Sequence, residues 1–118
     1  MESKLKEKDL ENLVLDYLNR SGVFAFKVNT VGVWDSKQNI YRSLSKFVLK
    51  GTSDILGVLP NGRFLAIEMK TKTGVASKEQ TAFINRVNKS GGLAFIARGI
   101  PDVKEKLDGL DRGKRELS

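Results

Sequence analysis

The chain has 118 residues and a formal net charge of +7, and it contains neither cysteine nor histidine. This composition excludes thiol and imidazole nucleophiles, histidine general bases, disulfides, and zinc sites built from cysteine or histidine. Any metal ion must therefore be held by oxygen ligands, which are typical of Mg²⁺ and Mn²⁺ sites. The positive charge favours a polyanionic partner such as nucleic acid.

The length predicts one domain spanning residues 1–118. No apolar stretch approaches the length of a membrane-spanning helix, and the charged N-terminal segment does not resemble a secretion signal. We therefore expect a cytoplasmic protein with no membrane association.

In the N-terminal part, apolar residues recur at helical spacing and predict a helix over about residues 3–19. The aromatic and branched residues of 23–28 predict a strand. Residues 29–50 show no clear period, and we expect a long loop there with a short helix near 41–47.

In the C-terminal part, apolar runs at about 52–59 and 63–70 predict two strands, and a strand at 93–97 follows the double glycine. A helix is predicted between the second and third of these strands, from a capping-box pattern at residues 77–80. A last short helix is expected to end near Leu107, with a loose tail over 108–118.

The predicted fold class is α/β, in the order α-β-β-β-α-β with a mixed central sheet flanked by helices. The strand-helix-strand unit requires a right-handed crossover and gives a parallel pair of strands. The turn residues Pro60, Asn61 and Gly62 predict a hairpin, which adds an antiparallel pair.

The length of this hairpin loop decides which side chains share a face. An odd loop of three or five residues pairs Asp54 with Glu68, whereas a two-residue loop pairs Asp54 with Met69 and turns Glu68 away. Lys70 shares the face of Glu68. Two opposed carboxylates repel each other, and a bound cation would remove that cost. An odd loop therefore predicts a cation site with a lysine for a phosphate, and the alternative is a solvated, polar end of the hairpin.

These residues, in this order, resemble the VRR-NUC family of the PD-(D/E)XK nuclease superfamily, whose core is restriction-endonuclease-like. The resemblance runs over most of the chain and rests on matches to the family's basic-x-Asn, G-x-P-D, E-x-K and S-x-x-Q patterns and to its last core strand: Lys27 to Asn29, Gly51 to Gly57, Ala66 to Lys70, Ser77 to Gln80, and Gly91 to Arg98. Ser53 stands where the motif usually has proline.

The resemblance implies hydrolysis of a DNA phosphodiester with Mg²⁺, for which Mn²⁺ can substitute. Asp54, Glu68 and the main-chain carbonyl of Met69 would ligate the metal, which polarises the phosphate and activates a water molecule. Lys70 would orient or deprotonate that water, or stabilise the developing charge.

Two further catalytic positions follow from the same resemblance. Gln80 would point from the start of its helix into the site, although it can instead reach back to the Ser77 cap. The first helix of such nucleases usually supplies another acidic residue, and Glu7 and Glu11 are both candidates, four residues apart. The spacing to the strand that follows Gly22 favours Glu11.

Contacts with DNA are expected from basic and polar residues near the predicted site, namely Lys27, Asn29, Lys50, Lys72 and Lys78. Ordinary solvated surface is the alternative for each of them. Trp34 and Tyr41 are expected to form a lid or a subunit contact, with stacking on exposed bases as the alternative.

The preferred function is a structure-selective endonuclease, most simply a homodimeric resolvase of branched DNA such as Holliday junctions, because a two-fold axis suits two symmetric cuts. The alternatives are a monomeric or partner-dependent flap or nicking enzyme and an inactive DNA-binding module. An RNA-directed nuclease ranks last. A helicase or recombination protein would be the natural partner, and a bacterial or phage source would suit such a nuclease.

Overall fold

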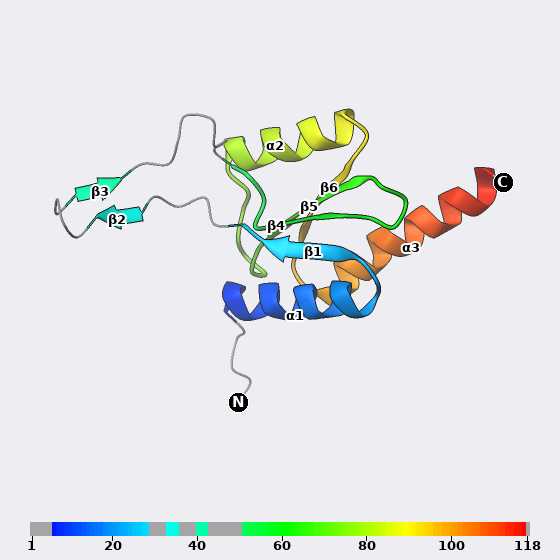
Figure 1. Cartoon of the computed structure of the whole chain (residues 1–118), viewed down its shortest axis with the longest axis horizontal. Coiled ribbons are helices and arrows are strands. Elements are labelled where there is room, and N and C mark those ends of the chain that lie inside the picture. The colour runs from blue at the N-terminus through cyan, green and yellow to red at the C-terminus, as the bar shows by residue number, and fades with distance from the viewer. Residues whose placement is uncertain (1–5, 29–32, 36–39, 43–50, 118) are drawn as a thin grey trace.

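The structure, a computed structural model, describes the backbone of residues 6–28, 33–35, 40–42 and 51–117, and the side chains of residues 6–28 and 51–110. Nine elements follow one another along this part of the chain (Figure 1): α1 (Glu7–Arg20), β1 (Phe24–Lys27), β2 (Val33–Asp35), β3 (Ile40–Arg42), β4 (Ile55–Val58), β5 (Phe64–Met69), α2 (Lys78–Lys89), β6 (Leu93–Ala97) and α3 (Ile100–Leu117).

The main sheet has the strand order β1-β4-β5-β6, with antiparallel pairs β1/β4 and β4/β5 and a parallel pair β5/β6. Helices α1 and α3 cover one face of this sheet and α2 covers the other (Figure 1). The mixed α/β fold predicted from the sequence is therefore confirmed, including the crossover through α2.

The hydrophobic core lies between the sheet and helices α1 and α3. Strand β5 shows why, because its alternate residues Leu65, Ile67 and Met69 point into this core and are fully buried. They pack with Val14 and Leu18 of α1. The opposite face of β5 carries Ala66 and Glu68, which are also buried, so β5 is covered on both sides.

Helix α2 packs mainly on β5 and β6 and leaves the neighbouring strands less covered. Four apolar side chains on this side of the sheet stay between 42% and 64% exposed, and we call them the open face: Phe24, Phe26, Val58 and Phe64. Phe24 pairs with Val58, and Val58 pairs with Phe64, so these three form one row across the strands.

The β4–β5 hairpin has the odd loop that the site requires. The Leu59 N–H donates to the Arg63 carbonyl at 2.9 Å, and Ile55 lies opposite Ile67. The loop is Pro60-Asn61-Gly62, which is the three-residue alternative, with Gly62 at a φ of +89°. Continuing the same register by one residue places Asp54 opposite Glu68.

Two expectations from the sequence are wrong. Residues 33–35 and 40–42 form an antiparallel pair, β2 and β3, where a long loop was expected. The strand Ile40–Arg42 also excludes the start of the short helix expected near 41–47, and the rest of that helix lies outside the described residues. Valine, tryptophan, isoleucine and tyrosine in these segments all favour strands.

Helix α3 continues to Leu117, so the helix end near Leu107 and the loose tail over 108–118 were also wrong for residues 108–117. The apolar residues Val103, Leu107 and Leu110 recur at helical spacing and pack on the core. A glycine inside a helix, such as Gly109, costs only about 1 kcal/mol, which is too little to end a helix anchored in this way. No helix in the described part of the chain is long and apolar enough to cross a membrane.

Candidate active site

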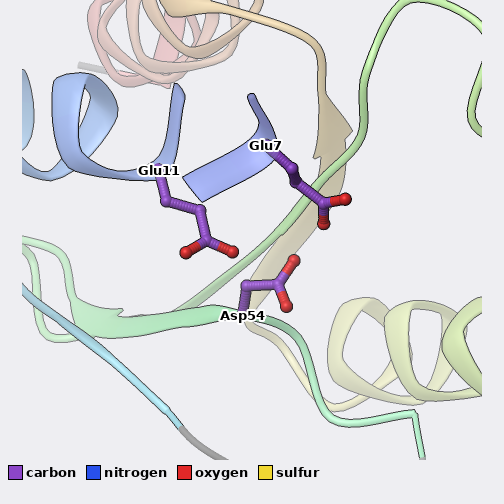
Figure 2. Close-up of side chains that lie close together, drawn as sticks. All are labelled: Glu7, Glu11 and Asp54. Atoms are coloured by element: carbon purple, nitrogen blue, oxygen red, sulfur yellow. The ribbon is translucent and has the colours of Figure 1, made fainter. Parts of the chain in front are cut away.

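Carboxylates from α1 and from the start of β4 meet at one end of the sheet. Glu7 and Glu11 point from α1 toward Asp54, which directly precedes β4 (Figure 2). One carboxylate oxygen from each of these three residues lies within 4.8 Å of the others. The spacing from the helix to the next strand favoured Glu11 over Glu7. In the structure both side chains reach Asp54, so the two candidates are not exclusive.

Asp54 is held in place by the backbones of the two neighbouring strands. Its Oδ2 accepts a hydrogen bond from the Met69 N–H at 3.0 Å, and its carbonyl accepts one from the Val28 N–H at 2.9 Å. Met69 thus contributes its N–H to the site, while the predicted role of its carbonyl as a metal ligand stays a prediction.

Glu68 is the buried member of the group, with only 1% of its surface exposed. Its Oε1 accepts a hydrogen bond from Gln80 Nε2 at 2.6 Å and lies 3.6 Å from Lys70 Nζ. Its Oε2 is buried and has no hydrogen-bond partner among the described residues. Burial and the nearby charge of Asp54 raise the pKa of Glu68 to about 7, against the opposing effect of Lys70.

Gln80 makes contacts in both of the directions that the sequence offered as alternatives, while its catalytic role stays a prediction. Its Oε1 accepts from the Ser77 N–H at 2.9 Å, and its own N–H donates to Ser77 Oγ at 3.1 Å, which completes a capping box. Its Nε2 at the same time donates to Glu68. One amide group therefore caps α2 and contacts the candidate site.

Gly51 brings the segment before β4 against the start of α2, a role that the sequence analysis did not foresee. Its φ is +82°, and a Cβ placed on it would lie 2.3 Å from the Glu79 carbonyl carbon. Only glycine tolerates both the backbone conformation and this close approach. The sequence contains a signal for this contact, because a glycine stands three residues before Asp54, but the motif alone gives no structural reason for it.

Lys27 lies at the site but pairs with a protein carboxylate. Its Nζ is 3.5 Å from Glu11 Oε2, and the Glu11 side chain is 17% exposed. Burial and the charge of Asp54 raise the pKa of Glu11, and Lys27 opposes this rise. Lys27 therefore offsets part of the negative charge of the cluster, and its predicted contact with DNA stays a prediction.

The structure describes only some of the other residues that were predicted to contact DNA. Lys72 and Lys78 are exposed, in the loop after β5 and at the first position of α2. Asn29 and Lys50 lie outside the described residues, and so do the side chains of Trp34 and Tyr41.

The donor set fits a hard divalent cation. All the ligand groups are carboxylate oxygens, which such ions prefer, and one of them, Glu68 Oε2, is buried with no hydrogen-bond partner in the part of the chain that the structure describes. Burial and the charge of Asp54 raise the pKa values of Glu11 and Glu68, and a cation among these carboxylates would remove their repulsion. Lys70 supplies a positive group beside the same oxygens. This arrangement suits metal-assisted chemistry on a phosphate group.

Comparisons with known proteins identify the family of the chain. The sequence model of the VRR-NUC domain matches residues 35–101, which is more than half of the chain. The matched part contains Asp54, Glu68, Lys70 and Gln80, whereas Glu7 and Glu11 precede it and join the site through the geometry alone.

Among solved structures, a chain described as "VRR_NUC domain protein" is similar in fold, with a TM-score of 0.63 and 19% sequence identity over 90% of this chain and 88% of that chain. No curated protein sequence matches. The sequence match over residues 35–101, with the shared fold, shows that this chain belongs to the VRR-NUC domain family.

Proposed function

We propose that this protein is a Mg²⁺-dependent endonuclease that hydrolyses phosphodiester bonds in branched DNA. The observation that carries the proposal is the meeting of four carboxylates, from α1, the start of β4 and β5, beside the amine of Lys70. The membership in a nuclease-type domain family supports the same reaction class.

Asp54 and Glu68 would hold the ion, with Glu7, Glu11 and the Met69 carbonyl as additional ligands. A bound divalent ion supplies Lewis-acid activation of water and neutralises charge on the phosphate, and Mn²⁺ offers the same chemistry. Glu68 must be ionised to act as a ligand. Gln80 would fix the orientation of Glu68, because it donates to one carboxylate oxygen, while the other has no hydrogen-bond partner among the residues that the structure describes.

Lys70 would act on the phosphate and its attacking water. Its side chain is 15% exposed, and its Nζ stands 3.6 Å from Glu68 Oε1. In its charged form the amine stabilises negative charge that develops on the phosphate oxygens, and in its neutral form it accepts a proton from the attacking water. Either role needs the amine to stay beside the carboxylates.

The proposed substrate is DNA with a branch point, such as a Holliday junction. The net charge of +7 and the exposed Lys72 and Lys78 support attraction to a polyanion, which would weaken steeply with salt. Two copies related by a two-fold axis would make the paired cuts that a four-way junction requires. The enzyme would meet such DNA in the bacterial cytoplasm, in concert with a helicase or recombination protein.

Cleavage of labelled DNA forms tests this function. A four-way junction, a flap, a fork and a plain duplex are incubated with Mg²⁺, Mn²⁺ or EDTA. Wild type is compared with Glu68→Ala and with the control Glu105→Ala, which removes an exposed carboxylate from α3. We expect paired symmetric cuts in the junction that are lost in EDTA and in Glu68→Ala but kept in Glu105→Ala.

Other outcomes would revise the proposal. Cuts in flaps alone, or single nicks, would favour a monomeric or partner-dependent enzyme. Binding of DNA without metal-dependent cleavage of any form would mean that the domain serves as a binding module.

A further inference from the structure

Arg98 binds the backbone of the loop that follows β5, residues 71–74. It comes directly after β6, and its Nη1 donates to the carbonyls of Thr71 at 2.6 Å and Gly74 at 2.8 Å, with a longer contact to Lys72 at 3.4 Å. Its own N–H donates to Asp102 Oδ2 at 2.8 Å, which anchors Arg98 to the start of α3. The guanidinium group thus closes residues 71–74 onto the end of β6.

The same loop packs against the stem of Lys70. A Cβ placed on Gly74 would lie 3.4 Å from Lys70 Cδ, so the turn passes beside the methylene chain of the lysine. The loop is a tight turn, since the Gly74 N–H donates to the Thr71 carbonyl at 3.1 Å. The backbone of Lys70 is itself fixed, because its N–H donates to the Ala97 carbonyl at 3.0 Å.

A lysine amine needs this support to keep one position. Four rotatable bonds separate the amine from the backbone, and holding them in one conformation costs side-chain entropy. Glu68 Oε1 attracts the amine at 3.6 Å, and this attraction acts on the end of the side chain and not on its stem. The turn supplies the restraint on the stem, and Arg98 holds the turn.

We propose that Arg98 is a positioning residue, which keeps the Lys70 amine at the reacting phosphate by clamping the 71–74 turn against the lysine stem. The inference rests on the proposed function for its catalytic consequence, whereas its structural consequence concerns Lys70 alone. Arg98 has a positioning role in this scheme, in which it contacts neither the site carboxylates nor the DNA.

The chain offers a matched control at the other end of the sheet. Arg63 also binds two main-chain carbonyls through its guanidinium, from Nε to Gly91 and from Nη2 to Gly92, each at 2.9 Å. It ties the β4–β5 hairpin to the loop before β6, far along the strands from Lys70. Arg98→Ala and Arg63→Ala therefore remove the same kind of contact, but only the first releases the turn beside Lys70.

The first experiment measures cleavage and binding separately. Single-turnover cleavage with saturating protein and Mg²⁺ gives the rate constant, and fluorescence anisotropy in EDTA gives the Kd for the same DNA. We expect Arg98→Ala to lower the rate constant by about 10- to 100-fold, because small displacements of a catalytic group have effects of this size. The Kd should change less than about threefold, Arg98→Lys should restore part of the rate, and Arg63→Ala should keep it within about twofold.

The second experiment follows Lys70 without any nuclease activity. Metal-free protein is treated briefly with an acetylating reagent, and mass spectrometry gives the rate of modification of Lys70 relative to the exposed Lys72. We expect Lys70 to react severalfold faster in Arg98→Ala than in wild type, and at the wild-type rate in Arg63→Ala.

The two experiments separate the failure of this inference from the failure of the proposed function. Equal rate losses in Arg98→Ala and Arg63→Ala, or an unchanged Lys70 modification rate in Arg98→Ala, would overturn the positioning role. A wild type that cuts no DNA, combined with faster Lys70 modification in Arg98→Ala, would overturn the proposed function and support the clamp.

Discussion

The two ends of the β4–β5 hairpin are built from opposite chemistry. At the turn end, Val58 and Phe64 of the open face leave apolar surface in water, and none of the buried side-chain atoms without a hydrogen-bond partner in the described residues lies there. At the other end, Asp54 and Glu68 bring carboxylates together, and two buried oxygens, Ser53 Oγ and Glu68 Oε2, have no hydrogen-bond partner among the described residues. An arginine fastens the backbone at each end, Arg63 at the turn and Arg98 at the site.

This contrast shows where the molecule gives up stability for function. Exposed apolar side chains are common on protein surfaces and cost little. A buried carboxylate whose pKa is raised is costly, and it persists only where the surrounding structure enforces it. Among the described residues, the buried carboxylate with a raised pKa and the buried oxygens without a partner all lie at the site end. Local departures of this kind are expected at a binding or catalytic site.

The largest effect should come from the lysine at the site end. Lys70→Met should lower the single-turnover cleavage rate by about 10²- to 10⁴-fold, the range typical for loss of a general acid-base group, with DNA binding changed only a few-fold. Lys72→Met, two residues away and exposed, should weaken binding slightly and keep the rate. Similar rates for the two variants would show that Lys70 takes no part in the reaction.

Glycines at the two ends should differ in their effect on stability. Gly51→Ala should lower the free energy of unfolding by about 3 kcal/mol, because the new methyl group would strain a positive φ and collide with the Glu79 backbone. Gly62→Ala in the turn also strains a positive φ but meets open space, and it should cost about 1 kcal/mol. Urea unfolding monitored by circular dichroism gives both values, and equal losses would contradict the close approach at Gly51.

The raised pKa of Glu68 predicts how stability depends on pH in the metal-free protein. The folded state holds its proton up to about pH 7, whereas an unfolded glutamate loses it near its ordinary value of 4.5. Between these values the folded state binds more protons, so the free energy of unfolding falls as the pH rises, by up to about 3 kcal/mol from this group.

Glu68→Gln removes this titration while preserving the shape of the side chain. The melting temperature of the variant relative to wild type should therefore increase from pH 5 to pH 8 in EDTA. Mg²⁺ should reduce the difference at pH 8, because the ion competes with the proton for the carboxylate. A difference in melting temperature between the two proteins that stays constant from pH 5 to pH 8 would mean that Glu68 titrates normally.

The smallest expected effects separate the two roles of Gln80. Ser77→Ala removes the helix cap and should cost about 1 kcal/mol of stability with little change in the cleavage rate. Gln80→Ala should cost a similar amount and also lower the rate about tenfold, because Glu68 loses the donor that orients it. A rate loss of the same size in both variants would assign Gln80 to the cap alone.

The sequence predicted the parts of this site that depend on neighbouring residues and missed those that join residues far apart in the chain. The pairing of Asp54 with Glu68 was predictable, because turn residues restrict the loop and strand alternation does the rest. The contact between Lys27 and Glu11 was not, since it depends on how α1 packs on the sheet, which no local pattern encodes. The Arg98 clamp likewise joins residues more than twenty positions apart.

The errors in the fold have a similar origin. The sequence analysis placed the end of the last helix near Leu107, but Leu107 and Leu110 pack on the core and α3 continues past Gly109, whose cost within a helix is small. Segments 33–35 and 40–42 are too short for a clear alternation of apolar and polar residues, and their pairing with each other stabilises them as strands.

The double contact of Gln80 links the order of α2 to events at the site. The first turn of a helix is where local unfolding usually begins, and here its amide groups share one side chain with Glu68. A ligand that fixes Glu68 therefore also closes the end of the helix. Hydrogen exchange at the amides of Ser77 and Gln80 would slow on binding, so the backbone of α2 serves as a natural reporter of occupancy some distance along the chain from the carboxylates themselves.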